Sequence, residues 1–155
     1  MMIAKLKFCA IVSTLLFCLA CQSNTLLNDH LSVPNQQWSY DQQLNSELKV
    51  NDTLGHYNAY LNLRINNNYR YANLYVLLRF QQPNSSKQLR YQFKLAAADG
   101  RWLGKGSSDI YSFQFPLFTN YRFTDTGTYR ISIEQNMRDN PLVGVSDVGL
   151  VVQKQ

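Results

Sequence analysis

Hydrophobic and polar residues alternate along most of this chain, in short segments separated by turn-forming residues. The clearest segment is 57–65, where Tyr57, Ala59, Leu61, Leu63 and Ile65 share one register and mainly polar residues occupy the other. Successive side chains of a β-strand point to opposite faces, so this pattern predicts a strand with one buried face. No segment keeps a 3.6-residue period over three turns, and we therefore expect no substantial helix.

Several further segments repeat this alternation and complete the predicted sheets. The expected inward residues are Leu74, Val76, Leu78 and Phe80, then Leu89, Tyr91, Phe93 and Leu95, then alternate residues of 110–115, then Tyr129, Ile131 and Ile133, and finally Val148, Leu150 and Val152. Segments 38–40 and 47–50 are candidates for edge strands. The pattern predicts an all-β fold, an antiparallel β-sandwich of about seven to eight strands with jelly-roll or immunoglobulin-like connections. A closed barrel is the alternative.

The first 20 residues have a different character. Lys5 and Lys7 precede an apolar run, Phe8 to Ala20, which is too short to span a bilayer. The run ends in Cys18-Leu19-Ala20-Cys21, which resembles a bacterial lipoprotein signal with Cys18 where leucine is usual. We therefore expect residues 1–20 to be a cleaved signal peptide and Cys21 to be acylated, with the lipid membrane as a partner. An ordinary signal peptidase site nearby is the alternative.

Removal of residues 1–20 would leave 135 of the 155 residues. Residues 21–37 are polar and include Pro34, so they are expected to be a tether, with the β-sandwich domain at 38–155. The formal charge falls from +5 to +3 with the loss of Lys5 and Lys7, and the remaining basic residues are scattered. Nucleic-acid binding needs a concentrated basic surface and is not expected.

The mature sequence offers no recognisable catalytic or metal-binding pattern. After Cys21 it has no cysteine, which excludes thiolate zinc sites and cysteine nucleophiles there. His30 and His56 are far apart in sequence, and neither has a second ligand at metal-binding spacing. The segment from Gly100 to Gly106 lacks the spacing of a phosphate-binding loop. We expect no enzyme, no metal and no cofactor, and rank an enzyme built from dispersed acidic residues last.

Tyrosine and tryptophan are more numerous than a small core requires. Tyr60 and Tyr75 fall on the outward register of their strands, and Trp102 lies in a glycine-rich turn. Exposed aromatic rings bind sugars or protein partners with little loss of side-chain entropy. These three residues are the candidate binding surface, with a glycan as a possible ligand. The alternative is that they cover the outer faces of the sheets as cross-strand pairs.

An ordered set of segments resembles one known family. The segments are YLNLR at 60–64, YRYANLY at 69–75, LAAADGRWLGKG at 95–106, GTY at 127–129, EQNMR at 134–138 and LVGVSDVGL at 142–150. Together they are similar to GldH, a gliding-motility lipoprotein family of the Bacteroidota. The resemblance implies an exported lipoprotein, acylated at Cys21, that works with other envelope proteins of the gliding and type IX secretion machinery. It implies no catalytic residue. Residues 22–24 lack the acidic cluster of a surface-export signal, which favours the outer membrane with the domain facing the periplasm.

Overall fold

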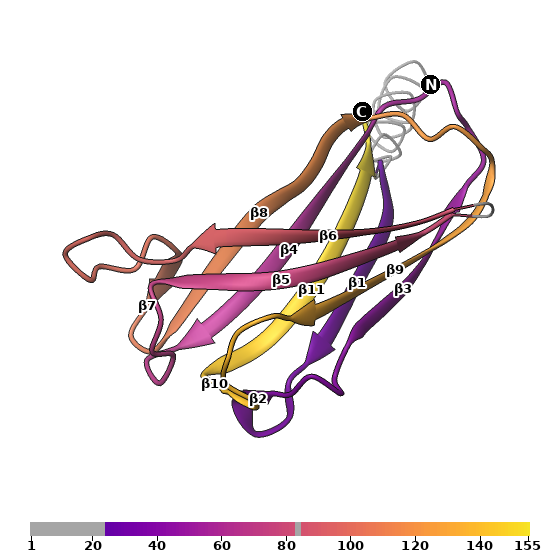
Figure 1. The fold of residues 1–155 in the computed structure, drawn as a ribbon. Helices are drawn as coiled ribbons and strands as arrows, with labels where there is room; N and C mark the ends of the chain where they lie inside the picture. The colour runs from indigo at the N-terminus through magenta and orange to yellow at the C-terminus, as the bar shows by residue number, and fades with distance from the viewer. Residues whose placement is uncertain (1–23, 83–84) are drawn as a thin grey trace, which may run out of the picture.

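The computed structural model describes residues 24–82 and 85–155, which form two antiparallel sheets packed face to face (Figure 1). One sheet has five strands in the order β1–β11–β4–β8–β7, and the other has four in the order β3–β9–β5–β6. A small ribbon of β2 and β10 lies at one end of the sandwich (Figure 1). This architecture confirms the predicted all-β antiparallel sandwich.

The strands in chain order are β1 (Thr25–Ser32), β2 (Gln37–Trp38), β3 (Leu44–Val50), β4 (Tyr57–Asn66), β5 (Asn73–Gln81), β6 (Ser86–Lys94), β7 (Lys105–Ser107), β8 (Ile110–Tyr121), β9 (Gly127–Gln135), β10 (Leu142–Val143) and β11 (Val145–Lys154). A single 3-10 turn, η2 (Pro34–Gln36), precedes β2. The described residues thus hold eleven strands, more than expected, because β2, β7 and β10 are very short and β1 was assigned to the tether. No helix in this part of the chain is long and apolar enough to cross a membrane.

The alternating registers face the core as the sequence predicts. All five odd positions of β4 from Tyr57 to Ile65 are buried, and so are the four even positions of β5 from Leu74 to Phe80. Trp38 is fully buried at the end closed by β2 and β10, where its Nε1 donates to the carbonyl of Gln42 at 2.7 Å. One apolar core therefore fills the space between the sheets.

The expected tether over 21–37 is wrong for Thr25–Ser32, and the domain begins at Thr25 rather than at Trp38. This segment is β1, which pairs with β11 from Thr25 opposite Gln153 to Ser32 opposite Asp147. Leu27 and Leu31 pack against the core, while the residues between them are mostly polar. An edge strand that covers only the margin of a core needs few apolar residues, so its alternation is easily mistaken for a polar linker.

Four tyrosines, of which Tyr57, Tyr69 and Tyr129 are buried and Tyr91 is half-buried, have a hydroxyl that donates to a backbone carbonyl. The pairs are Tyr57 with Asp52 at 2.5 Å, Tyr69 with Asn73 at 2.9 Å, Tyr91 with Leu117 at 2.7 Å and Tyr129 with Asp125 at 2.6 Å. Burial is the main reason why the pKa of all four phenols is raised, and the pKa of Tyr69 is raised the most. Each hydroxyl thus stays protonated and ties a strand to a loop or to another strand.

Gly144 joins β10 to β11 at a point with no room for a side chain. Its φ is +90°, a region that favours glycine, and an added Cβ would lie 2.4 Å from the backbone nitrogen of Tyr69. Its N–H donates to the carbonyl of Gln36 and its carbonyl accepts from the N–H of Asn66, both at 2.8 Å. This one residue therefore holds three segments of the chain together.

Stability should fall as the pH rises above about 10, because phenols of the unfolded chain ionise near that pH while the buried ones keep their protons. A raised folded-state pKa contributes stability that is complete below the unfolded pKa and is lost as the pH rises towards the folded one. Urea unfolding from about pH 8 to about pH 11 measures this loss. Tyr69→Phe should flatten the dependence, since it removes the group with the most raised pKa. An unchanged slope in this variant would contradict the assignment.

Gly144→Ala should destabilise the domain more than Gly100→Ala does. Both glycines have positive φ, so each substitution costs about 1–2 kcal/mol of backbone strain. At Gly100 an added Cβ meets nothing within 4 Å, whereas at Gly144 it meets the backbone of Tyr69. Overpacking adds about 1–3 kcal/mol at such a position. Equal free energies of unfolding for the two variants, measured by chemical denaturation, would show that the contact is not tight.

Candidate functional site

Cys21, the expected lipidation site, lies outside the described residues and stays a prediction. The first strand nevertheless shows which end of the sandwich the N-terminal segment enters. Thr25 lies opposite Gln153 of β11. Strand β4, the other neighbour of β11, begins at the same end of the sheet, where Tyr57 lies opposite Lys154. We call this the terminal end of the sandwich, and the end with β2, β7 and β10 the distal end (Figure 1).

The three aromatic residues of the expected binding surface do not come together. Tyr60 is on the outer face of the five-stranded sheet, in register with Val151 and Pro116. Tyr75 is on the outer face of the other sheet, where the guanidinium of Arg90 lies 4.3 Å from its ring centroid. These two outer faces are on opposite sides of the molecule, so a single stacking platform is not formed.

Trp102 holds a loop against the distal end. Its ring lies edge-on to Tyr69 at 6.2 Å between centroids and is tilted against Tyr111 at 5.8 Å. Its backbone forms an isolated bridge with Ala96. The indole is half-buried in this cluster. Its surroundings account for Trp102 by packing alone.

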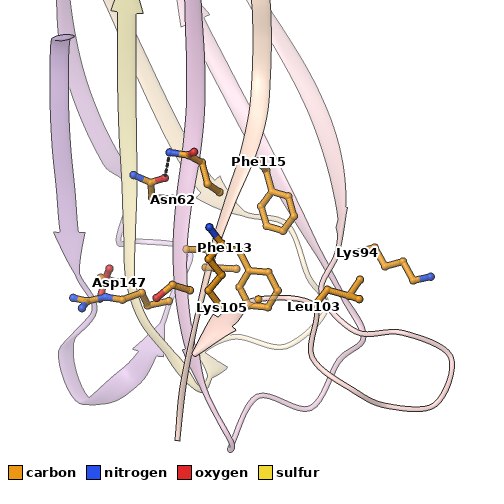
Figure 2. A pocket seen from close by; sticks show the side chains of 12 residues that line it. Asn62, Lys94, Leu103, Lys105, Phe113, Phe115 and Asp147 are labelled. Carbon is orange, nitrogen blue, oxygen red and sulfur yellow. Dashed lines mark hydrogen bonds and ion pairs between the residues drawn. The ribbon is translucent and has the colours of Figure 1, made fainter. Parts of the chain in front are cut away.

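A groove of about 780 Å³ lies near the distal end (Figure 2). Because side chains alternate along β8, Ser112 and Gln114 line it from the outer face, and Phe113 and Phe115 from the inner face. The groove therefore runs around the edge of the sheet rather than into the core. On the outer face Gln114 Nε2 donates to Asn62 Oδ1 at 3.1 Å.

Charged side chains of both signs line this groove. Arg64 Nε donates to Asp147 Oδ2 at 2.5 Å, so the one carboxylate lining the groove is already paired. Lys94 and Lys105 also line it and form no ion pair with any described residue. No group of three or more potential metal ligands occurs in residues 24–82 and 85–155.

Two other ion pairs stabilise the sheets at their surfaces. At the terminal end Lys154 Nζ lies 2.7 Å from Asp52 Oδ2, and their hydrogen bond lowers the pKa of Asp52 and raises that of Lys154. On the four-stranded sheet Arg79 binds both oxygens of Glu134 at 2.8 Å, which raises the pKa of Arg79. Exposed pairs of this kind contribute little to stability. They join neighbouring segments of the chain.

A smaller hollow, of about 200 Å³, opens between β6 and β8 on the side of the sandwich. We call it the slot, and it is lined by Leu78, Phe80, Lys87, Leu89, Tyr91, Phe118 and Tyr121. The sequence places Leu89, Tyr91, Phe93 and Leu95 in the core; Phe93 and Leu95 are buried, whereas Tyr91 is half-buried and Leu89 is 46% exposed. The expectation is wrong for Leu89 because β6 is an edge strand and nothing described covers its inner face there. The composition of residues 86–94, with three basic residues and no acidic one, is the sequence signal that could have identified this segment as an edge strand.

A solved structure is distantly similar to this chain, and sequence relatives are more strongly similar. Among solved structures, a carbohydrate-binding module specific for non-crystalline cellulose matches 84% of this chain and 74% of its own, with 10% identity and a TM-score of 0.47. At that level the likeness carries no argument about ligands.

Sequence relatives match over almost the whole chain. The gliding motility lipoprotein GldH homolog of Christiangramia forsetii is 29% identical over 153 residues, which cover 92% of each chain. The gliding motility lipoprotein GldH of Flavobacterium johnsoniae is 27% identical over 144 residues, 88% of this chain and 89% of the relative. The model of the GldH lipoprotein family matches residues 25–152, from the first residue of β1 into β11. This chain is therefore a member of the GldH lipoprotein family.

Proposed function

We propose that this protein is anchored to the cell envelope through acylated Cys21 and serves as a non-catalytic component of the gliding motility and type IX secretion machinery. The observation that carries the proposal is the family match over residues 25–152, which spans nearly all of the sandwich. The membrane and other envelope proteins are its partners, and it needs no cofactor. We place it at the outer membrane, with the domain facing the periplasm.

The surface chemistry of the sandwich supports a role in assembly. The carboxylates of Asp52, Glu134 and Asp147 each bind a basic side chain of a neighbouring segment. The groove and the slot both lie along strand edges. Such surfaces favour binding of other macromolecules over conversion of a substrate.

The Cys21→Ala substitution should abolish lipid labelling, because the thiol of that residue is the proposed acylation point. Radiolabelled palmitate fed to cells that express the full chain measures it. Cys18→Leu is the matched control, since it places the more usual leucine three residues before Cys21 and should retain or increase the label. Label that persists in Cys21→Ala would overturn the assignment of the anchor.

Deletion of the gene in a gliding host should reduce colony spreading and the secretion of type IX substrates. The full chain should restore both, and the Cys21→Ala form should restore neither although its sandwich folds normally by circular dichroism. Spreading and secretion are measured in the same strains. Normal behaviour of the deletion strain would contradict the proposed role.

A further inference from the structure

We propose that the side of the sandwich between β6 and β8 binds an extended acidic segment of a partner protein. The segment adds as a strand to β6 and places one large apolar side chain in the slot. This inference rests on the proposed function only in taking the partner to be another envelope protein. We call this region the open side, and four features of the described residues support its role.

The two sides of the sandwich differ in how the sheets meet. On one side the edge strands β1 and β3 approach each other, with Cα atoms within 8 Å. On the open side, side chains span the distance between β6 and β8. Phe93 stacks on Phe115 with 4.5 Å between ring centroids, and the hydroxyl of Tyr91 donates to the carbonyl of Leu117 at 2.7 Å. The core is thus closed by aromatic rings on a side that leaves strand edges uncovered.

The slot has the character of an anchor site. Its walls are apolar except for Lys87 at β6, and they include Leu89, Phe118 and Tyr121, all at least partly exposed. A volume of about 200 Å³ admits one large apolar side chain and excludes a folded element. Binding energy at protein interfaces concentrates where such an anchor enters a pocket that it fills.

Strand β6 offers the better edge for a strand to join. Its nine residues, Ser86–Lys94, pair with β5 without a register shift, and no described strand pairs with its other edge. Strand β8 is less suitable, because its pairing with β4 is irregular near Ala59 and the Leu117 carbonyl already accepts from Tyr91. An extended peptide gains main-chain hydrogen bonds by adding to a free, regular edge.

The charge on β6 selects the occupant. The strand carries Lys87, Arg90 and Lys94 and no acidic residue, and neither lysine is in an ion pair with a described residue. Pairing of β6 with β6 of a second copy would bring these cations together, which disfavours a dimer through this edge. Arg90 and Lys94 lie on the outer register of β6, whereas Lys87 lies with Leu89 on the inner register that lines the slot. A segment with acidic residues on its outer face and apolar residues on its inner face therefore matches Arg90, Lys94 and the slot.

Photocrosslinking of the full-length lipoprotein in its native cells tests this proposal. A photoreactive phenylalanine analogue is incorporated at position 89, in the slot, or at position 54. Leu54 is 77% exposed in the loop before β4 at the terminal end and serves as the control for an exposed apolar position. Position 89 should give a protein adduct that is absent at position 54. Mass spectrometry of the crosslinked peptide should show a segment of alternating apolar and acidic residues from another protein.

Charge reversal on the two edge strands of the same sheet provides the matched comparison. Lys94→Glu should lower the yield of the adduct by about tenfold, because Lys94 is on the outer register of β6 and the acidic side chains of the partner strand would then face a like charge. Lys49→Glu on β3, where the lysine is also exposed and unpaired within the described residues, should change it little. Thermal unfolding of each variant confirms that the sandwich is intact.

Several outcomes would overturn the proposal. They are no adduct at position 89, the same adduct at both positions, an adduct with a second copy or with lipid, a basic crosslinked segment, and equal yields from Lys94→Glu and Lys49→Glu. The proposed function fails separately. If deletion leaves spreading and secretion normal but the acidic adduct forms, the open side is a docking surface and the machinery is a different one.

Discussion

The two sheets are held together by side-chain packing, because they share no strand and residues 24–155 contain no cysteine for a disulfide. Near the terminal end an aromatic cluster packs the two sheets against each other. Phe123 lies 4.9 Å from Tyr57 of one sheet and 4.7 Å from Tyr129 of the other, as ring centroids. Aromatic pairs of this kind add about 0.5–1.5 kcal/mol each beyond the burial of their area. The hydroxyls of Tyr57 and Tyr129 leave the cluster towards backbone carbonyls, so no buried phenol lacks an acceptor there.

How much of the fold the sequence predicts depends on how deeply each strand is buried. Strand β4 lies between two neighbours and is recognised from its alternation, because every second side chain must enter the core. Strand β1 has two leucines facing the core among polar residues, and its partner β11 follows more than 110 residues later, so local pattern does not reveal it. Strand β6 has the two-residue period of a strand, but only the structure shows that no described segment covers Leu89.

The candidate site was less predictable than the fold, because it depends on which edges remain free. Trp102 illustrates this. From sequence it is an exposed ring in a glycine-rich turn, whereas in the structure it packs on Tyr69 and Tyr111. The chain before Lys105 is thereby held at the distal end, and β7 pairs with β8 for only three residues. The remainder of β8 has no neighbour on that side among the described strands, which is why its aromatic residues line hollows.

The position of β1 has a consequence for how far the domain can move. With a lipid on Cys21, four residues would connect the membrane to Thr25, the first residue of the sheet. A fully extended chain of that length spans about 14 Å, less than the length of a typical strand. The sandwich could then tilt relative to the membrane, but its first strand would stay within about 14 Å of the bilayer. Partners of the domain would then meet it close to the membrane surface.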